Sequence, residues 1–221
     1  MIKKLSGKLI GKLAGRARRS RGQGLVETAL LFPVLLIVLS GMVEFGFLLN
    51  EYLALQDASR NAARFASDGL YYMSDLNKNC STTQDFYRQT ACLVNQELAQ
   101  ERPRVQINIG NGVDDIIVSA FSVAQGVGVI ARHPDGPEEF GWSMAVDQGG
   151  ARNQVSRLTS ADLTSRITNS APSTGLVSVE VFHGYEQKLN LPWISAFLPD
   201  PLVLHNYAIM PLVSAEPEPA P

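Results

Sequence analysis

Few residues of this sequence have the types and spacing that chemistry requires. His183 lies three residues from both Glu180 and Glu186, a set that could transfer protons, although a lone histidine on a strand is more often structural. Asp114 and Asp115 are adjacent, but one acidic pair supplies too few oxygens for a calcium site and more simply caps a hairpin.

Other catalytic signatures are missing from the sequence. It has no nucleophile elbow, phosphate-binding loop, HExxH motif or EF-hand loop. The three histidines are distant in sequence from the two cysteines, so a zinc site is not expected. We therefore expect no enzymatic activity, no metal and no cofactor.

Two carboxylates flank a long apolar run. No charged residue lies between Glu27 and Glu44, and the apolar character continues to Leu49. About 20 helical residues cross a ~30 Å hydrocarbon core, and a helix satisfies its own backbone there. The run predicts a transmembrane span at about 25–49. Glu27 lies just inside this span, which marks a functional residue unless its side chain reaches the interface, and Glu44 is expected at the outer interface, where a charge costs little.

A basic leader precedes the span. Residues 1–22 carry eight Lys or Arg and no Asp or Glu. Positive residues beside a span stay in the cytoplasm, so we expect a cytoplasmic N-terminus and an extracytoplasmic chain after the span. Because topology alone explains this charge, membrane lipid is the expected partner and nucleic acid is not.

Four stretches resemble a known family: Arg21–Glu27, Pro33, Gly41–Gly46 and Leu55–Arg64. Together they look like the TadE-type minor pseudopilins of the Tad (type IVc, Flp) pilus machinery, over about residues 16–68. The resemblance implies a bacterial inner-membrane protein that a prepilin peptidase cuts between Gly22 and Gln23, with Gly24 as a poorer second site.

The same resemblance implies an assembly role. Glu27, fifth from the cut, would pair with the new N-terminal amine of a neighbouring subunit, because each charge is costly alone in a low dielectric. Implied partners are other Tad pseudopilins, the peptidase, the inner-membrane assembly platform and, as a further candidate, the major Flp pilin, with incorporation into the pilus left open. The alternative is an uncleaved single-pass membrane protein whose outer domain binds a ligand or an envelope component.

The span is expected to continue as one helix over 23–67. Pro33 can kink it, while Gly41 and Gly46 would allow another helix to approach closely. Beyond the membrane, apolar residues at helical spacing predict a packed stripe: Leu55, Ala58, Ala62, Phe65 and Ala66. Arg60 and Arg64 share one face, which is either a solvated edge or a docking face for a partner.

The rest predicts an extracytoplasmic α+β domain over 68–214, followed by a disordered tail at 215–221. An oxidising compartment favours a disulfide between Cys80 and Cys92, the second of which falls in a helix expected from about Gln84.

Strand signals in this domain predict a mostly antiparallel sheet packed on the long helix, the plan that pilins share. The runs 104–109 and 114–123 around Gly-Asn-Gly predict a hairpin, with further strands expected at 127–132, 175–183 and 202–210.

Three segments of the domain are expected to be less regular. Residues 133–155 read as a surface loop anchored by Phe140 and Trp142, and 160–167 as a short helix with a serine cap. The apolar segment 191–199 is expected to fold onto the core, with the membrane or another subunit as alternatives.

Overall fold

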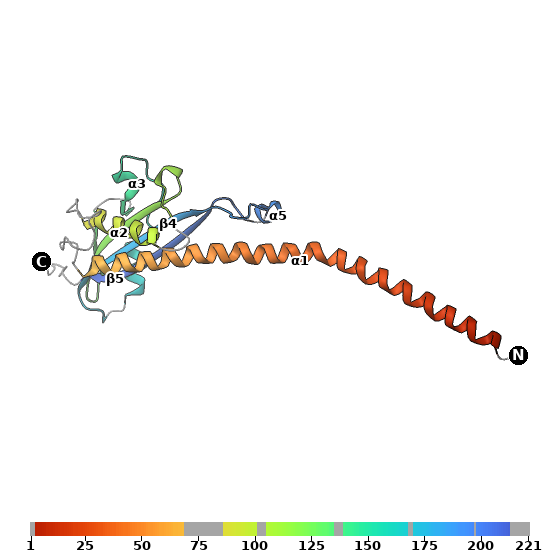
Figure 1. Cartoon of the computed structure of the whole chain (residues 1–221). Helices are drawn as coiled ribbons and strands as arrows, with labels where there is room; N and C mark the ends of the chain where they lie inside the picture. Colours follow the sequence, from red (N-terminus) through yellow and green to blue (C-terminus); the bar gives the residue numbers. More distant parts are fainter. Residues whose placement is uncertain are drawn as a thin grey trace.

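One helix runs through most of the length of the protein. The structure, a computed structural model, describes residues 3–68, 86–100, 105–134, 139–167, 170–196 and 198–212, with side chains from Gly22 onward. The sheet and the other described helices lie beside the C-terminal half of helix α1 (Lys3–Ser67), and the N-terminal half of α1 extends alone (Figure 1). This arrangement confirms the predicted long helix and the α+β class.

The C-terminal half of α1 packs because its inner face is made of small side chains. The predicted stripe is buried at Leu55, Ala58, Ala62 and Ala66, and Phe65 is half-buried. Ala63 and Ser59 are also buried, and the Ser59 hydroxyl lies 3.0 Å from the Asn206 side-chain oxygen on the sheet. Small residues bring the helix axis close to the strands, so this face is covered by the protein's own domain.

The sheet is antiparallel throughout. Its main path follows the order β2-β1-β4-β5, and a short strand, β3, pairs with β1 beside β2. The strands are β1 (Asp115–Ala124), β2 (Gly128–His133), β3 (Trp142–Ser143), β4 (Thr174–Tyr185) and β5 (Leu202–Leu212). The predicted strands at 127–132, 175–183 and 202–210 are therefore confirmed as β2, β4 and β5.

Alternating residues of β4 divide the domain into two layers. Val177, Val179, Val181 and Tyr185 belong to the core beneath α1 and helix α2 (Phe86–Gln100). The intervening positions, including Glu180, face the opposite side of the sheet. That side carries the loop before helix α4 (Ser160–Arg166), and α4 itself packs beside β2.

Three local predictions need correction. Residues 105–108 form no strand, and the 3-10 helix η2 (Ile109–Asn111) follows them, so the predicted hairpin is wrong. The side chains of Asn108 and Asn111 accept backbone N–H groups of Gly110, Val113 and Asp114, which turns the chain before β1.

The other two corrections are smaller. The predicted loop 133–155 contains β3 and a one-turn helix, α3 (Met144–Asp147). Trp142 stacks on Tyr87 with ring centroids 6.1 Å apart, as an anchor should. The predicted short helix at 160–167 is α4 (Ser160–Arg166), and its N-cap is Thr159 rather than a serine, with Asp162 completing a capping box.

Candidate functional site

The first candidate site is the uncovered part of α1. Among the described residues, every side chain from Gly22 to Leu39 is exposed, and none of them is packed against the domain. By length and composition this helix is apolar enough to cross a membrane. Large apolar side chains exposed to water are unfavourable, so this surface requires a lipid or protein environment.

Glu27 lies on this exposed surface with Gly22 and Gln23, the predicted cleavage site. Within the described part of the chain its carboxylate makes no hydrogen bond or ion pair. The neighbouring Thr28 hydroxyl is instead satisfied by the carbonyl of Gly24 at 2.8 Å. Cleavage and pairing in an assembly stay predictions.

The predicted helix-packing residues are free of intramolecular constraint. A Cβ atom added at Gly41 or Gly46 would meet nothing within 4 Å, so the fold of one chain does not require glycine there. Pro33 lies inside α1, in the half that curves in Figure 1. A role in contacts between chains is compatible with these positions but is untested.

Arg60 and Arg64 point away from the domain and are exposed, which leaves both expected readings of this face open. Cys92 lies half-buried on α2, whereas Cys80 lies outside the described residues, so their pairing stays a prediction. The tail at 215–221 also lies outside the described residues.

Glu44 contradicts its prediction. Only 2% of it is exposed, and its carboxylate accepts three hydrogen bonds from the last residue of β4 and the segment just after it. The donors are the Tyr185 hydroxyl at 2.6 Å and the backbone N–H groups of Lys188 at 2.8 Å and Leu189 at 2.9 Å. Burial and the adjacent carboxylate raise the pKa of Tyr185, so its hydroxyl stays a donor. We call this group the Glu44 latch, since it joins α1 to the domain.

A second buried acid, Glu51, lies two turns farther along the same face. One oxygen is 2.8 Å from Lys188 Nζ, and the other is 3.5 Å from Nε2 of His183. That second oxygen has no hydrogen-bond partner within normal distance. His183 Nδ1 lies 3.1 Å from Asp114, so the imidazole bridges carboxylates from two parts of the chain.

The electrostatics of this cluster favour a charged histidine. Burial on its own lowers the pKa of His183, but the hydrogen bond to Asp114 and the negative charges of Asp114 and Glu51 raise it to about 9. Burial disfavours the charged form of Asp114 as well, which for a carboxyl group raises the pKa. Hydrogen bonds from His183, Asn111 and the backbone outweigh this effect and lower the pKa of Asp114 overall. A cavity of about 220 Å³ borders the cluster, with Glu51, Asp114, His183 and Lys188 among its lining residues.

Glu180 does not join this cluster, because it faces the other side of the sheet. It is fully buried, with its carboxylate bonded to the Ser156 hydroxyl, the Arg157 N–H at 2.9 Å and His205 Nε2 at 3.0 Å. The pairing of His183 with Glu180 or Glu186, weighed as a catalytic set, is therefore not formed with Glu180.

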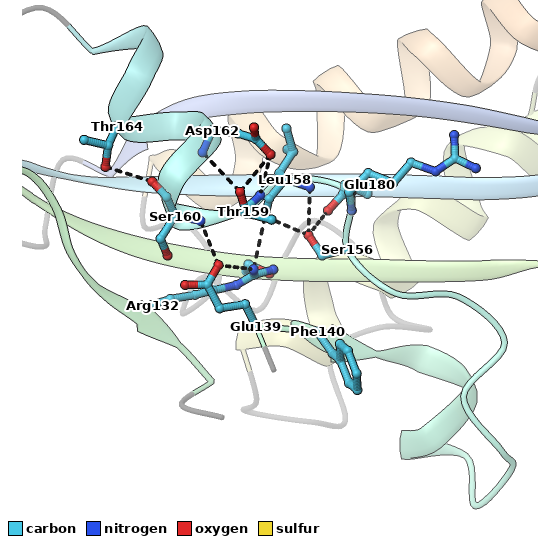
Figure 2. A network of polar contacts seen from close by, with 12 residues as sticks. Arg132, Glu139, Phe140, Ser156, Leu158, Thr159, Ser160, Asp162, Thr164 and Glu180 are labelled. Carbon is cyan, nitrogen blue, oxygen red and sulfur yellow. Dashed lines mark hydrogen bonds and ion pairs between the residues drawn. The ribbon is translucent and has the colours of Figure 1, made fainter. Parts of the chain in front are cut away.

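Arg132 extends the Glu180 network along the loop (Figure 2). Its guanidinium donates to the Leu158 carbonyl and the Ser119 hydroxyl, and lies 3.6 Å from Glu139, which accepts from the Ser160 N–H. Figure 2 shows these groups converging between the loop and the sheet. The arrangement fastens the loop to this face and acts structurally.

The segment after the latch also differs from expectation. Helix α5 (Pro192–Ser195) does not fold back onto the core but extends beside α1 toward its N-terminal half (Figure 1). The Trp193 indole N–H donates to the Ser40 hydroxyl at 3.0 Å. We call residues 189–196 the arm.

The sequence did contain a signal for the latch. Glu44 and Glu51 are seven residues apart, which places both on one helix face, in line with the buried stripe from Leu55. Two acids on a face that becomes apolar predict buried carboxylates with dedicated donors. Their partners, Tyr185 and Lys188, carry no comparable signal because they lie more than 130 residues away.

These features define a class: a single helix whose uncovered half is apolar and whose other half is built into an α+β domain. The family model described as TadE-like protein matches residues 22–64, the helix from Gly22 to Arg64. This match confirms the TadE-like resemblance of the helix and associates the chain with the Tad pilus system. No curated protein and no solved structure matches the chain.

Proposed function

We propose that the protein is a minor pseudopilin that takes part in priming or tip-complex assembly of a Tad (type IVc, Flp) pilus, in a structural rather than an enzymatic role. The observation that carries the proposal is the coincidence of the TadE-like match with the helix whose apolar half is uncovered. An uncovered apolar helix is suited to lipid before assembly and to neighbouring helices afterwards.

The orientation follows from charge. The basic leader keeps the N-terminus in the cytoplasm, so the α+β domain is extracytoplasmic. A prepilin peptidase then cuts after Gly22 and leaves the ammonium of Gln23 at the membrane boundary. Glu27 of a neighbouring subunit pairs with it and sets the axial register of the bundle.

Among the residues that the structure describes, Glu27 has no partner, which supports this pairing. A carboxylate in an apolar helix is costly unless a cation is supplied, and the described side chains supply none. A second subunit would provide one.

Mass spectrometry of the mature protein tests processing. Cells with the peptidase should yield an N-terminus at Gln23, and cells without it should yield an intact Met1. An intact Met1 in both strains would contradict the pseudopilin and support the anchored alternative. The cavity beside Glu51 and His183 is the observation that favours this alternative, since it could take a small polar ligand.

Photo-crosslinking tests the role of Glu27. A crosslinker at Leu31, which is exposed on the same segment, should capture neighbouring pseudopilins. Glu27→Gln should remove these products while membrane insertion persists, because the neutral amide cannot neutralise the ammonium. Thr28→Val is the matched control and should leave the products unchanged. Normal crosslinking and normal piliation of the Glu27→Gln variant would refute the pairing.

A further inference from the structure

The arm after β4 is held against α1 at a specific depth. The backbone N–H groups of Lys188, just before the arm, and of Leu189, its first residue, donate to the buried Glu44. Trp193 donates to Ser40, one turn closer to the N-terminus of α1. The arm therefore runs from the edge of the domain to the start of the uncovered apolar surface. Neither contact involves the core of the domain.

The position of Ser40 matches a membrane boundary. It lies 18 residues after Gly22, so about 27 Å separates the two along the helix axis at 1.5 Å per residue. That distance is close to the ~30 Å thickness of the hydrocarbon core. If the basic leader marks one interface, Ser40 and Trp193 lie at the other, and the span ends there rather than at Leu49.

The chemistry of the arm suits that depth. Trp193 is 40% exposed and Leu198, which follows the arm, is 39% exposed, so both present apolar surface, as Met42 and Val43 of α1 also do. A tryptophan with an apolar ring and a satisfied N–H is the side chain enriched at membrane interfaces. Lipid that surrounds the uncovered half of α1 would meet the Trp193 ring as well.

The arm is also braced from behind. Ser195 donates to the side-chain oxygen of Gln187 at 3.1 Å, and the Gln187 amide donates to the Leu198 carbonyl at 3.3 Å. Ile194 is buried within the same turn. These contacts keep the arm extended along α1, where an unbraced apolar segment would collapse onto the domain.

We propose that the arm is a second membrane contact, with Trp193 in the lipid headgroup region on the domain side of the bilayer, where it sets how deeply α1 is inserted. This proposal rests on membrane anchoring by α1 but not on pilus assembly or peptidase processing. It holds equally for a cleaved pseudopilin and for an uncleaved anchor.

Fluorescence quenching by brominated lipids tests it directly. The chain has two tryptophans, so Trp142→Phe leaves Trp193 alone and keeps an aromatic ring against Tyr87. The full-length protein is placed in nanodiscs at one chain per disc. Trp193 emission should be blue-shifted and quenched by bromines near the headgroups more than by bromines at the bilayer centre. Aqueous acrylamide should quench it weakly.

Trp193→Phe is the matched control, since it leaves only Trp142 in the domain. Its emission should not respond to brominated lipid. Brominated lipid should quench an intermediate fraction of the wild-type tryptophan emission, which provides a readout if one variant fails to fold. Quenching of Trp193 by acrylamide but not by brominated lipid would overturn the proposal. If Trp193 is protected from acrylamide only when a disc holds several chains, the proposal is also overturned, and a second copy of the chain covers the arm instead of lipid.

Discussion

The Glu44 carboxylate accepts a 2.6 Å hydrogen bond from the Tyr185 hydroxyl, although 141 residues separate the two along the chain. This bond lies where α1 passes from its uncovered half to its packed half. It ties α1 to the end of β4, in addition to the packing of the C-terminal half of α1 on the sheet. The predictions below begin with this pair.

Tyr185→Phe should weaken the domain's attachment to α1. The change removes one donor to a buried carboxylate, and hydrogen bonds to charged groups contribute about 1.5–3 kcal/mol. Chemical unfolding of the full-length protein in detergent micelles, followed by tryptophan fluorescence, measures the loss. Tyr207→Phe is the control, because Tyr207 is exposed and its hydroxyl accepts a hydrogen bond from Arg166 at the surface. Equal stability of the two variants would contradict the latch.

Glu44→Ala should release the arm. Three donors, namely Tyr185 and the N–H groups of Lys188 and Leu189, lose their acceptor, and each buried unsatisfied group costs about 1–3 kcal/mol. Hydrogen–deuterium exchange at residues 188–189 should accelerate more than exchange in the centre of β4. Asp57→Ala, an exposed acid on the same helix, should leave exchange at these residues unchanged. Protection that survives in Glu44→Ala would show that other contacts hold the arm.

Stability should fall between about pH 6.5 and 9. The pKa of His183 is raised to about 9, so the charged imidazole stabilises the fold fully below the unfolded pKa near 6.5. This contribution, at most about 3 kcal/mol, is lost as pH rises through the folded pKa. Asp114 and Glu51 contact the ring, Lys188 neutralises part of Glu51, and Glu186 lines the adjoining cavity.

His183→Gln checks this assignment. Free energies of unfolding measured across the pH range should lose most of their slope in this variant. His133→Gln changes an exposed histidine and should preserve the wild-type profile. A slope that persists in His183→Gln would assign the pH dependence to another group.

Gly128→Ala should destabilise the β1–β2 hairpin. Gly128 has φ +101, and an added Cβ would lie 2.4 Å from Thr164 Cγ2 on α4. Strain in this backbone region costs about 1–3 kcal/mol, and the steric conflict adds to it. Gly126→Asn is the control, because φ is +75 there, the space is open and asparagine tolerates this region. Thermal unfolding should show a clearly larger loss for Gly128→Ala.

The sequence by itself determined the parts of this protein that depend on local patterns. An uncharged run after a basic leader specified the apolar helix, and small residues at helical spacing from Leu55 to Ala66 specified its packed face. The TadE-like resemblance lies in the same stretch, and the family match over 22–64 confirms it. Alternation in β4 and β5 was readable because burial of one face imposes a two-residue period.

Only the tertiary structure decided which distant groups meet. It buried Glu44 where exposure was expected, separated His183 from Glu180 across the sheet, paired β1 with β4 instead of the run before it, and laid Trp193 beside Ser40. Each of these depends on a partner far away in sequence. Residue spacing reports the period of one element, whereas the environment of a charged or aromatic side chain is set by whichever other element packs against it.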